Sequence, residues 1–162
     1  MQNLSILPLG AGGTYDDIGT WMGNPSYIVA EDKLVTYYTA YGNITGLTIA
    51  CGVCPVRLDY SQFDDDSKSV GTYQSTPKLQ FQKLGIVIDH TGVPDSVGCR
   101  FPTYVYNTKQ KKFMVYYVGE AAGGARTICL ASGYAPDQLV KHTLNPVITP
   151  PAGTKLTVLY AP

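Results

Sequence analysis

Two stretches of the chain repeat one pattern, and this repeat decides the fold. Residues 16–29 read DDIGTWMGNPSYIV, and residues 95–106 read DSVGCRFPTYVY. Both run Asp-x-(Ile/Val)-Gly, then a short gap, then Pro-(Ser/Thr)-Tyr and an aliphatic residue. Self-similarity of this kind indicates that the chain contains two copies of one structural unit.

The likeness continues downstream in the same order. Residues 33–38 (KLVTYY) match 112–117 (KFMVYY), and residues 47–51 (LTIAC) match 128–132 (ICLAS). The difference in residue number drifts from 77 to 81 along these matches, as two copies with small loop differences would show. Three further segments resemble one another at the limits of the copies: 4–8, 84–88 and 144–148.

Each copy is expected to hold about four strands. In the second copy they are predicted at 102–107, 112–118, 126–132 and 140–148. The first pair forms a hairpin with a turn at 107–111, matched by 30–32 in the first copy. Nearly continuous apolar runs are typical of strands covered on both faces. A four-stranded antiparallel sheet between similar neighbours is a propeller blade.

We therefore predict an all-β, propeller-like fold with two four-stranded antiparallel blades and partial flanking strands. Its 17 Gly, 11 Pro and 13 Tyr are typical of a turn-rich β protein, and residues 135–140 are the best helical candidate. The 162 residues suit one domain, 1–162, with blade-like repeats at about 15–92 and 94–150. An insertion at 55–78 distinguishes the first copy. Its polar run 64–69 lacks the Gly and terminal Glu of an EF-hand, so we expect a solvated loop.

The charge balance excludes several classes of partner. Twelve basic residues offset twelve acidic ones, whereas proteins that grip many nucleic-acid phosphates carry a basic excess. No apolar run approaches the roughly 18 residues that span a bilayer. The N-terminal residues lack the basic stretch and apolar core of a Sec signal peptide. We expect no nucleic acid and no membrane, and a location on a virion or extracellular surface without a Sec signal, or otherwise in the cytoplasm.

Four cysteines allow two interpretations. Cys51 and Cys54 have the spacing of a zinc knuckle, but the remaining pair, Cys99 and Cys129, has no second C-x-x-C. Residues three apart on the strand predicted at 47–53 face opposite sides, whereas zinc needs converging thiolates. Disulfides need an oxidising compartment, and nothing targets the chain there. We therefore favour small buried thiols packed between sheets, and we expect no metal and no cofactor.

At these residues the chain resembles the five-bladed β-propellers of glycoside hydrolases of the family 43 and family 32 type. In that group a blade commonly begins after Asp-x-x-Gly-x-x-x-x-Pro-Ser-(Tyr/Val), as residues 16–27 do here. A Met-Tyr-Tyr type strand, an Ile-x-Leu-Ala-Ser strand and a return strand ending Asn-Pro-Val follow, here at 114–117, 128–132 and 145–147. The resemblance covers about two blades of five, and most of its motif residues are packing residues.

The resemblance implies hydrolysis of sugars by three acidic residues from separate blades around a central pocket. Glycoside hydrolysis needs a proton donor on the leaving oxygen and a second carboxylate. The candidates here are Asp16, Asp17, Asp95 and Glu120. An Asp before a strand is equally a turn and capping residue, and Glu120 is expected on a flexible loop. The sequence therefore leaves catalysis open and leans against it.

Two blades leave apolar flanks in water, and this shapes the functional hypothesis. The chain would be a fragment of a longer propeller, a part of a larger assembly, or a subunit that closes a ring, for example as a trimer. The strands expected at 155–160 and 4–9 would be exchange elements. We predict a non-catalytic module, a structural component of a phage or virion surface, fibre or decoration, with glycan binding through Trp21 and Tyr41. Trp21 is expected in a loop, and its alternative role is to fill the contact between the blades. The alternative function of the chain is a glycoside hydrolase that is truncated here or completed by oligomerisation.

Overall fold

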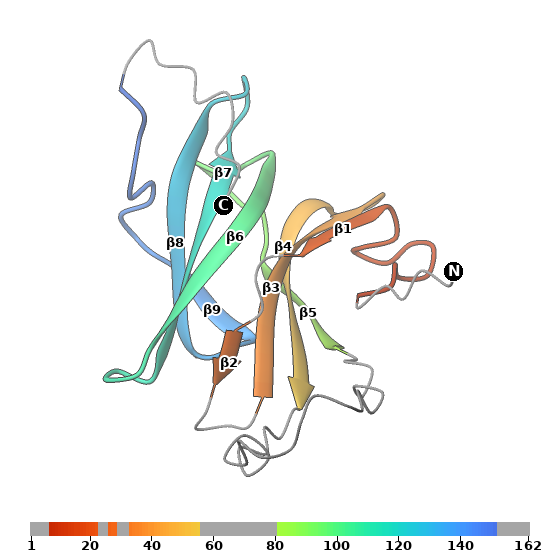
Figure 1. Cartoon of the computed structure of the whole chain (residues 1–162). Helices are drawn as coiled ribbons and strands as arrows, with labels where there is room; N and C mark the ends of the chain where they lie inside the picture. The colour runs from red at the N-terminus through yellow and green to blue at the C-terminus, as the bar shows by residue number, and fades with distance from the viewer. Residues whose placement is uncertain (1–6, 23–25, 29–32, 56–80, 152–162) are drawn as a thin grey trace, which may run out of the picture.

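The computed structural model describes residues 7–22, 26–28, 33–55 and 81–151. These residues form strands and no helix, so none of them builds an apolar helix of membrane-spanning length. The first group of strands is β1 (Gly19–Met22), β2 (Ser26–Ile28), β3 (Lys33–Gly42), β4 (Gly46–Pro55) and β5 (Gln82–Ile88). The second group is β6 (Gly98–Asn107), β7 (Lys112–Glu120), β8 (Arg126–Ala135) and β9 (Gln138–Lys141). Figure 1 shows the two groups lying beside each other. The nine strands of the described residues belong to one continuous sheet joined between β4 and β6, and we call its two halves the first and the second sheet.

Each group is an antiparallel sheet with four strand positions. β1 and β2 both pair with β3, so together they occupy the place of one first strand, followed by β3, β4 and β5. The second sheet runs β6, β7, β8 and β9 in the same order. A single parallel pair, Leu47 with Gly98, joins them. The predicted all-β, propeller-like fold is confirmed.

The strand pairing shows how the two copies correspond. Gly19 pairs with Tyr41 in the first sheet, and Gly98 pairs with Glu120 in the second. Both members of the second pair are 79 residues beyond those of the first. This constant difference replaces the predicted drift from 77 to 81.

The third strands follow the same rule, which corrects one of the sequence matches. Residues 49–51 of β4 pair with residues 37–39 of β3, and residues 128–130 of β8 pair with residues 116–118 of β7. Because 116–118 lie 79 residues beyond 37–39, residues 128–130 are the counterparts of 49–51. Matching the letters had paired 47–51 with 128–132, two residues out of register. A slip of two residues keeps each side chain on the same face of a strand, so the predicted pattern of apolar faces survives.

Several predicted boundaries move. β6 begins at Gly98 rather than at residue 102, and β9 covers only Gln138–Lys141 rather than 140–148. The helical candidate at 135–140 is instead the end of β8, a turn at 136–137 and most of β9, since six residues are too few for a helix to persist against strand pairing with β8. Predictions for residues 30–32, 64–69 and 155–160, and for most of 55–78, lie outside the described residues.

The main core lies between the two sheets. Tyr37 stands at its centre, edge-on to Tyr104 with ring centroids 4.9 Å apart, and also against Phe113. The Tyr37 hydroxyl donates a hydrogen bond to the Pro136 carbonyl at 3.0 Å. The buried residues of this core come from both sheets: Val35, Tyr37, Ile49, Cys51, Ile88, Cys99, Phe113, Val115, Tyr117, Cys129 and Ala131.

A second core covers the opposite face of the first sheet. There Tyr38 and Cys54 pack with Leu7 and Phe81, which come from outside the strands. Cys51 and Cys54 therefore face opposite sides of β4, as three-residue spacing on a strand requires. All four cysteines are buried and free, which confirms the prediction of packed thiols.

Candidate functional site

Two of the four candidate acids are buried and engaged in ion pairs. Asp16 and Asp95 are each 1% exposed. Asp16 is paired with Lys83, and Asp95 with Lys141, whose Nζ lies 2.7 Å from Asp95 Oδ2. Both carboxylates therefore face a lysine inside the chain and not the solvent.

The two ion pairs are copies of one another. Lys83 lies opposite Gly52, and Lys141 lies opposite Ala131, which is 79 residues beyond Gly52. Each pair therefore ties the loop before the first strand of a sheet to its fourth strand. In the second sheet the Tyr117 hydroxyl also donates to Asp95 Oδ2 at 2.7 Å. The pKa of Tyr117 is raised, mainly because the hydroxyl is buried and next because of this hydrogen bond to Asp95. The Tyr117 hydroxyl therefore stays protonated and acts as a neutral donor.

Asp17 has a different role from its neighbour Asp16. Its carboxylate accepts hydrogen bonds from the backbone N–H of Gly13 at 2.7 Å and of Asn43 at 2.9 Å. These two hydrogen bonds lower the pKa of Asp17, and the bond from Asn43 has the larger effect. A proton donor in glycoside hydrolysis needs the opposite shift, so Asp17 is suited to fixing a loop.

Glu120 is the last residue of β7 and is nearly buried, which corrects its predicted place on a flexible loop. Its carboxylate lies 2.7 Å from one guanidinium nitrogen of Arg100 and 3.5 Å from one of Arg126. In the described part of the chain, no hydrogen bond or ion pair joins any two of the four candidate acids. No group of three or more His, Cys, Asp or Glu there is arranged to hold a metal ion.

The predicted aromatic residues, in contrast, come together. Trp21 lies in β1, not in a loop, and stacks on Tyr41 of β3 with ring centroids 6.3 Å apart and planes 27° apart. Trp21 is 51% exposed and Tyr41 36%, so neither plugs a contact between the sheets. Gly19 permits this arrangement, because a Cβ there would lie 3.3 Å from the indole ring. The indole therefore lies along the strand with its surface open to solvent.

A third exposed aromatic residue, on the second sheet, was missed by sequence reasoning. Phe101 has a φ of +51°, which is rare for a residue with a side chain, and it sits at a register shift in β6. Its backbone N–H donates to Thr39 Oγ1 at 2.9 Å, and Thr39 is the strand partner of Trp21. The only sequence signal was its place before Pro102. We call Trp21, Tyr41 and Phe101 the aromatic surface.

The aromatic surface and the Glu120 ion pairs occupy equivalent places in the two sheets. Trp21 corresponds to Arg100 and Tyr41 to Glu120 by the constant difference of 79. A continuous row of strand partners links them: Gly19, Tyr41, Leu47, Gly98, Glu120 and Arg126. Three strand spacings separate Tyr41 from Glu120, which limits their backbone separation to about 15 Å. One end of the molecule thus presents aromatic rings and a charged cluster together.

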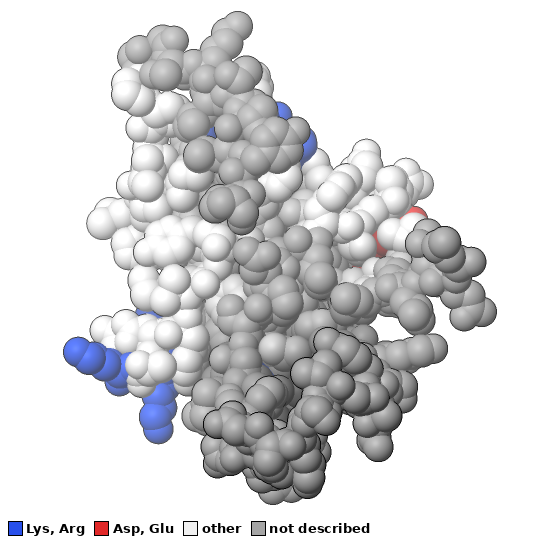
Figure 2. All heavy atoms as spheres, in the orientation of Figure 1, with Lys and Arg blue, Asp and Glu red and all other residues white. Residues whose placement is uncertain are grey.

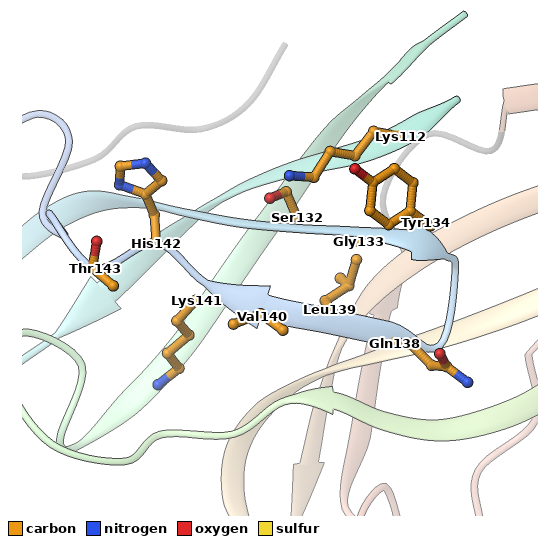
Figure 3. A pocket seen from close by; sticks show the side chains of 10 residues that line it. All are labelled: Lys112, Ser132, Gly133, Tyr134, Gln138, Leu139, Val140, Lys141, His142 and Thr143. Carbon is orange, nitrogen blue, oxygen red and sulfur yellow. The ribbon is translucent and has the colours of Figure 1, made fainter. Parts of the chain in front are cut away.

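An open hollow of about 590 Å³ lies along β8 and β9. Figure 3 shows the side chains of Lys112, Ser132 and Tyr134 together on one side of the β8 ribbon. The Lys112 ammonium is 5.6 Å from the centre of the Tyr134 ring. None of the four candidate acids lines this hollow.

Two solved structures resemble this chain at low sequence identity. No family model matches the chain, and no curated protein matches it. Among solved structures, a β-xylosidase matches 76% of this chain and 36% of its own length, at 14% identity and a TM-score of 0.48. The structure of a BT0996–RGII complex matches 83% of this chain and 39% of its own length, at 16% identity and a TM-score of 0.47. The chain therefore spans less than two fifths of the length of these structures.

Proposed function

We propose that this chain is a non-catalytic, propeller-like module that binds glycan on the aromatic surface and serves as a structural component of a larger assembly. The observation that carries the binding role is the exposed stack of Trp21 on Tyr41. Sugar rings present apolar C–H faces that pack on exposed aromatic rings, with hydroxyls free for polar neighbours. The Arg100 and Glu120 side chains supply such neighbours at the same end of the molecule.

The geometry of the acids supports a non-catalytic role. Glycoside hydrolases place two carboxylates on either side of one bond, about 5 to 9.5 Å apart, with one of them protonated. Here Asp16 and Asp95 are buried against lysines, Asp17 has a lowered pKa, and Glu120 is paired with two arginines. The alternative remains a glycoside hydrolase that is truncated here or completed by oligomerisation.

The single tryptophan makes the binding test direct. Trp21 is the only Trp of the chain, so its fluorescence reports on its own surface. We expect titration with oligosaccharides from a glycan array to change the emission of the wild type. Tyr41→Ala should weaken binding at least about tenfold, since loss of one stacked ring removes about 1.4 kcal/mol or more. Ile44→Ala is the matched control, because Ile44 is exposed on the neighbouring turn.

Three outcomes separate the hypotheses. Unchanged fluorescence with every glycan would contradict the binding role. Binding that survives in Tyr41→Ala and, by calorimetry, in Trp21→Ala would place the site elsewhere. Hydrolysis of aryl glycosides by the wild type, lost in the Asp17→Asn, Glu120→Gln double variant, would favour the enzyme.

The proposed assembly is a virion surface, fibre or decoration. Its support is the low charge, the abundance of Gly and Tyr and the apolar flank of an incomplete propeller. An antibody raised against the chain should label purified virus particles from the same source. Labelling confined to cell lysate would contradict this location and leave the glycan test unaffected.

A further inference from the structure

Glu120 is paired with two arginines, so this group of side chains has an excess of positive charge. Arg126 lies directly opposite Glu120 on β8, and Arg100 lies on β6, at the other side of β7. The strand partner of Arg100 is Val118, two residues from Glu120, so all three charged side chains share one face of the sheet. Among the described residues, neither arginine is paired with a second carboxylate. We call Arg100, Glu120 and Arg126 the arginine cluster.

The cations of the arginine cluster reach solvent more than the carboxylate does. The Arg100 and Arg126 side chains are 29% and 35% exposed, whereas the Glu120 side chain is 12% exposed. A guanidinium carries several N–H donors, and one nitrogen of each arginine faces Glu120. The Nε atoms of both have no hydrogen-bond partner in the described part of the chain. An anion that reaches the cluster can therefore gain charge-assisted hydrogen bonds from donors that Glu120 does not use.

The arginine cluster adjoins the aromatic surface. Arg100 directly precedes Phe101, whose backbone N–H donates to Thr39 Oγ1 of the first sheet. Thr39 in turn is the strand partner of Trp21. A short oligosaccharide stacked on the aromatic rings can therefore extend to the arginines.

A carboxylate on the other side of the aromatic surface sets the orientation of a charged ligand. Asp17 accepts a hydrogen bond from the backbone N–H of Asn43, in the turn that follows β3. The pKa of Asp17 is lowered by this bond and by the bond from Gly13, so it stays ionised. It repels an anionic group on that side, whereas the arginine cluster attracts one. The charged sugar of an acidic glycan is thus expected at the arginine end.

We propose that the glycan bound on the aromatic surface is acidic, and that a carboxylate of one of its sugars contacts Arg126 and Arg100. This inference rests on the glycan-binding role proposed above and names the class of glycan. Guanidinium N–H groups match the planar carboxylate in pairs. Arg126 is the more available of the two arginines, because it lies 3.5 Å from Glu120 whereas Arg100 lies 2.7 Å from it.

The test compares an acidic oligosaccharide with its methyl ester, which has the same sugars without the charge. The probes are oligogalacturonate and sialyllactose, and binding is followed by the fluorescence of Trp21, the only Trp of the chain. In at least one of these pairs, the acid should bind at least about tenfold more tightly than the ester, because the ester loses charge-assisted hydrogen bonds. This preference should shrink in about 0.5 M salt, which screens exposed charges.

Two variants of Arg126 locate the carboxylate. Arg126→Gln removes one cation but leaves the closer pair of Arg100 and Glu120 in place, and it should reduce the preference for the acid to about twofold or less. Arg126→Lys keeps the charge and should retain part of the preference. The matched control is Lys109→Gln, which makes the same change of charge in the turn between β6 and β7 and should leave the preference unchanged. This turn lies at the opposite end of both strands, at the lower left of Figure 1, and Figure 2 shows Lys and Arg atoms gathered there.

The other outcomes show which proposal fails. Equal binding of acid and ester would overturn the acidic class and leave glycan binding intact, and so would binding of neutral glycans without either acid. A preference that is unchanged in Arg126→Gln would place the carboxylate elsewhere and overturn the assignment to the arginine cluster. Unchanged fluorescence with every glycan would contradict the binding role itself. The comparison of acid with ester uses the wild type, so it holds even if a variant does not fold.

Discussion

Replacing Lys141 by Met tests whether the buried ion pairs hold the sheets together. The change keeps most of the aliphatic stem and removes the ammonium that contacts Asp95 at 2.7 Å. Asp95 is 1% exposed. Among the described residues, its side chain would keep as donors the Tyr117 hydroxyl and the weaker Cys99 thiol, 3.5 Å away. Breaking one partner of a buried pair costs about 3–5 kcal/mol, a large part of the roughly 5–15 kcal/mol that stabilises a domain.

Urea unfolding followed by circular dichroism measures this loss. With an m-value of about 2 kcal/mol per M, the midpoint should fall by about 2 M. Lys109→Met is the control, since Lys109 lies exposed on a turn and should shift the midpoint by less than about 0.3 M. Adding Asp95→Asn should recover more than about 1 kcal/mol, because it removes the unpaired charge. A free energy of unfolding for Lys141→Met within about 0.5 kcal/mol of the control would refute the structural role of the pair.

Three further predictions concern the same core. Gly119→Ala should destabilise the fold by about 1–3 kcal/mol in urea unfolding, because its Cβ would lie 2.9 Å from Cys129 Sγ, whereas Gly12→Ala, with open space around it, should be neutral. Burial raises the pKa of Cys51 to about 12 and that of Cys99 as well. The native thiols should therefore resist a thiol reagent at pH 8 and react on unfolding; fast reaction of the native protein would contradict their burial. Since the unfolded thiols ionise first, stability should be full below about pH 8.5 and fall above it, as thermal melts at increasing pH would show.

The repeat and its strands were predictable from the sequence because they depend on local patterns. The Asp-x-x-Gly and Pro-x-Tyr motifs recur in order, and alternation along a strand fixes which residues share a face. That is why the opposite orientations of Cys51 and Cys54 were predicted correctly. The short segment at 135–140 was misassigned because its strand pairing with β8 depends on residues outside the segment.

The roles of the candidate residues could not be predicted, because they depend on contacts between distant strands. Nothing local distinguishes Asp16 from Asp17, yet one is buried against Lys83 and the other binds backbone N–H groups. Their partners lie far along the chain, and the strand register selects them. Phe101 was missed for a related reason, since its positive φ is maintained by a hydrogen bond to Thr39 on the other sheet.

Local patterns were enough to establish an all-β chain of two similar units, because periodic burial and turn residues act over a few neighbours. What those units present to solvent depends instead on how the two sheets meet. One parallel pair, Leu47 with Gly98, brings the ends of the sheets together, and with them the Trp21–Tyr41 stack and the ion pairs of Glu120.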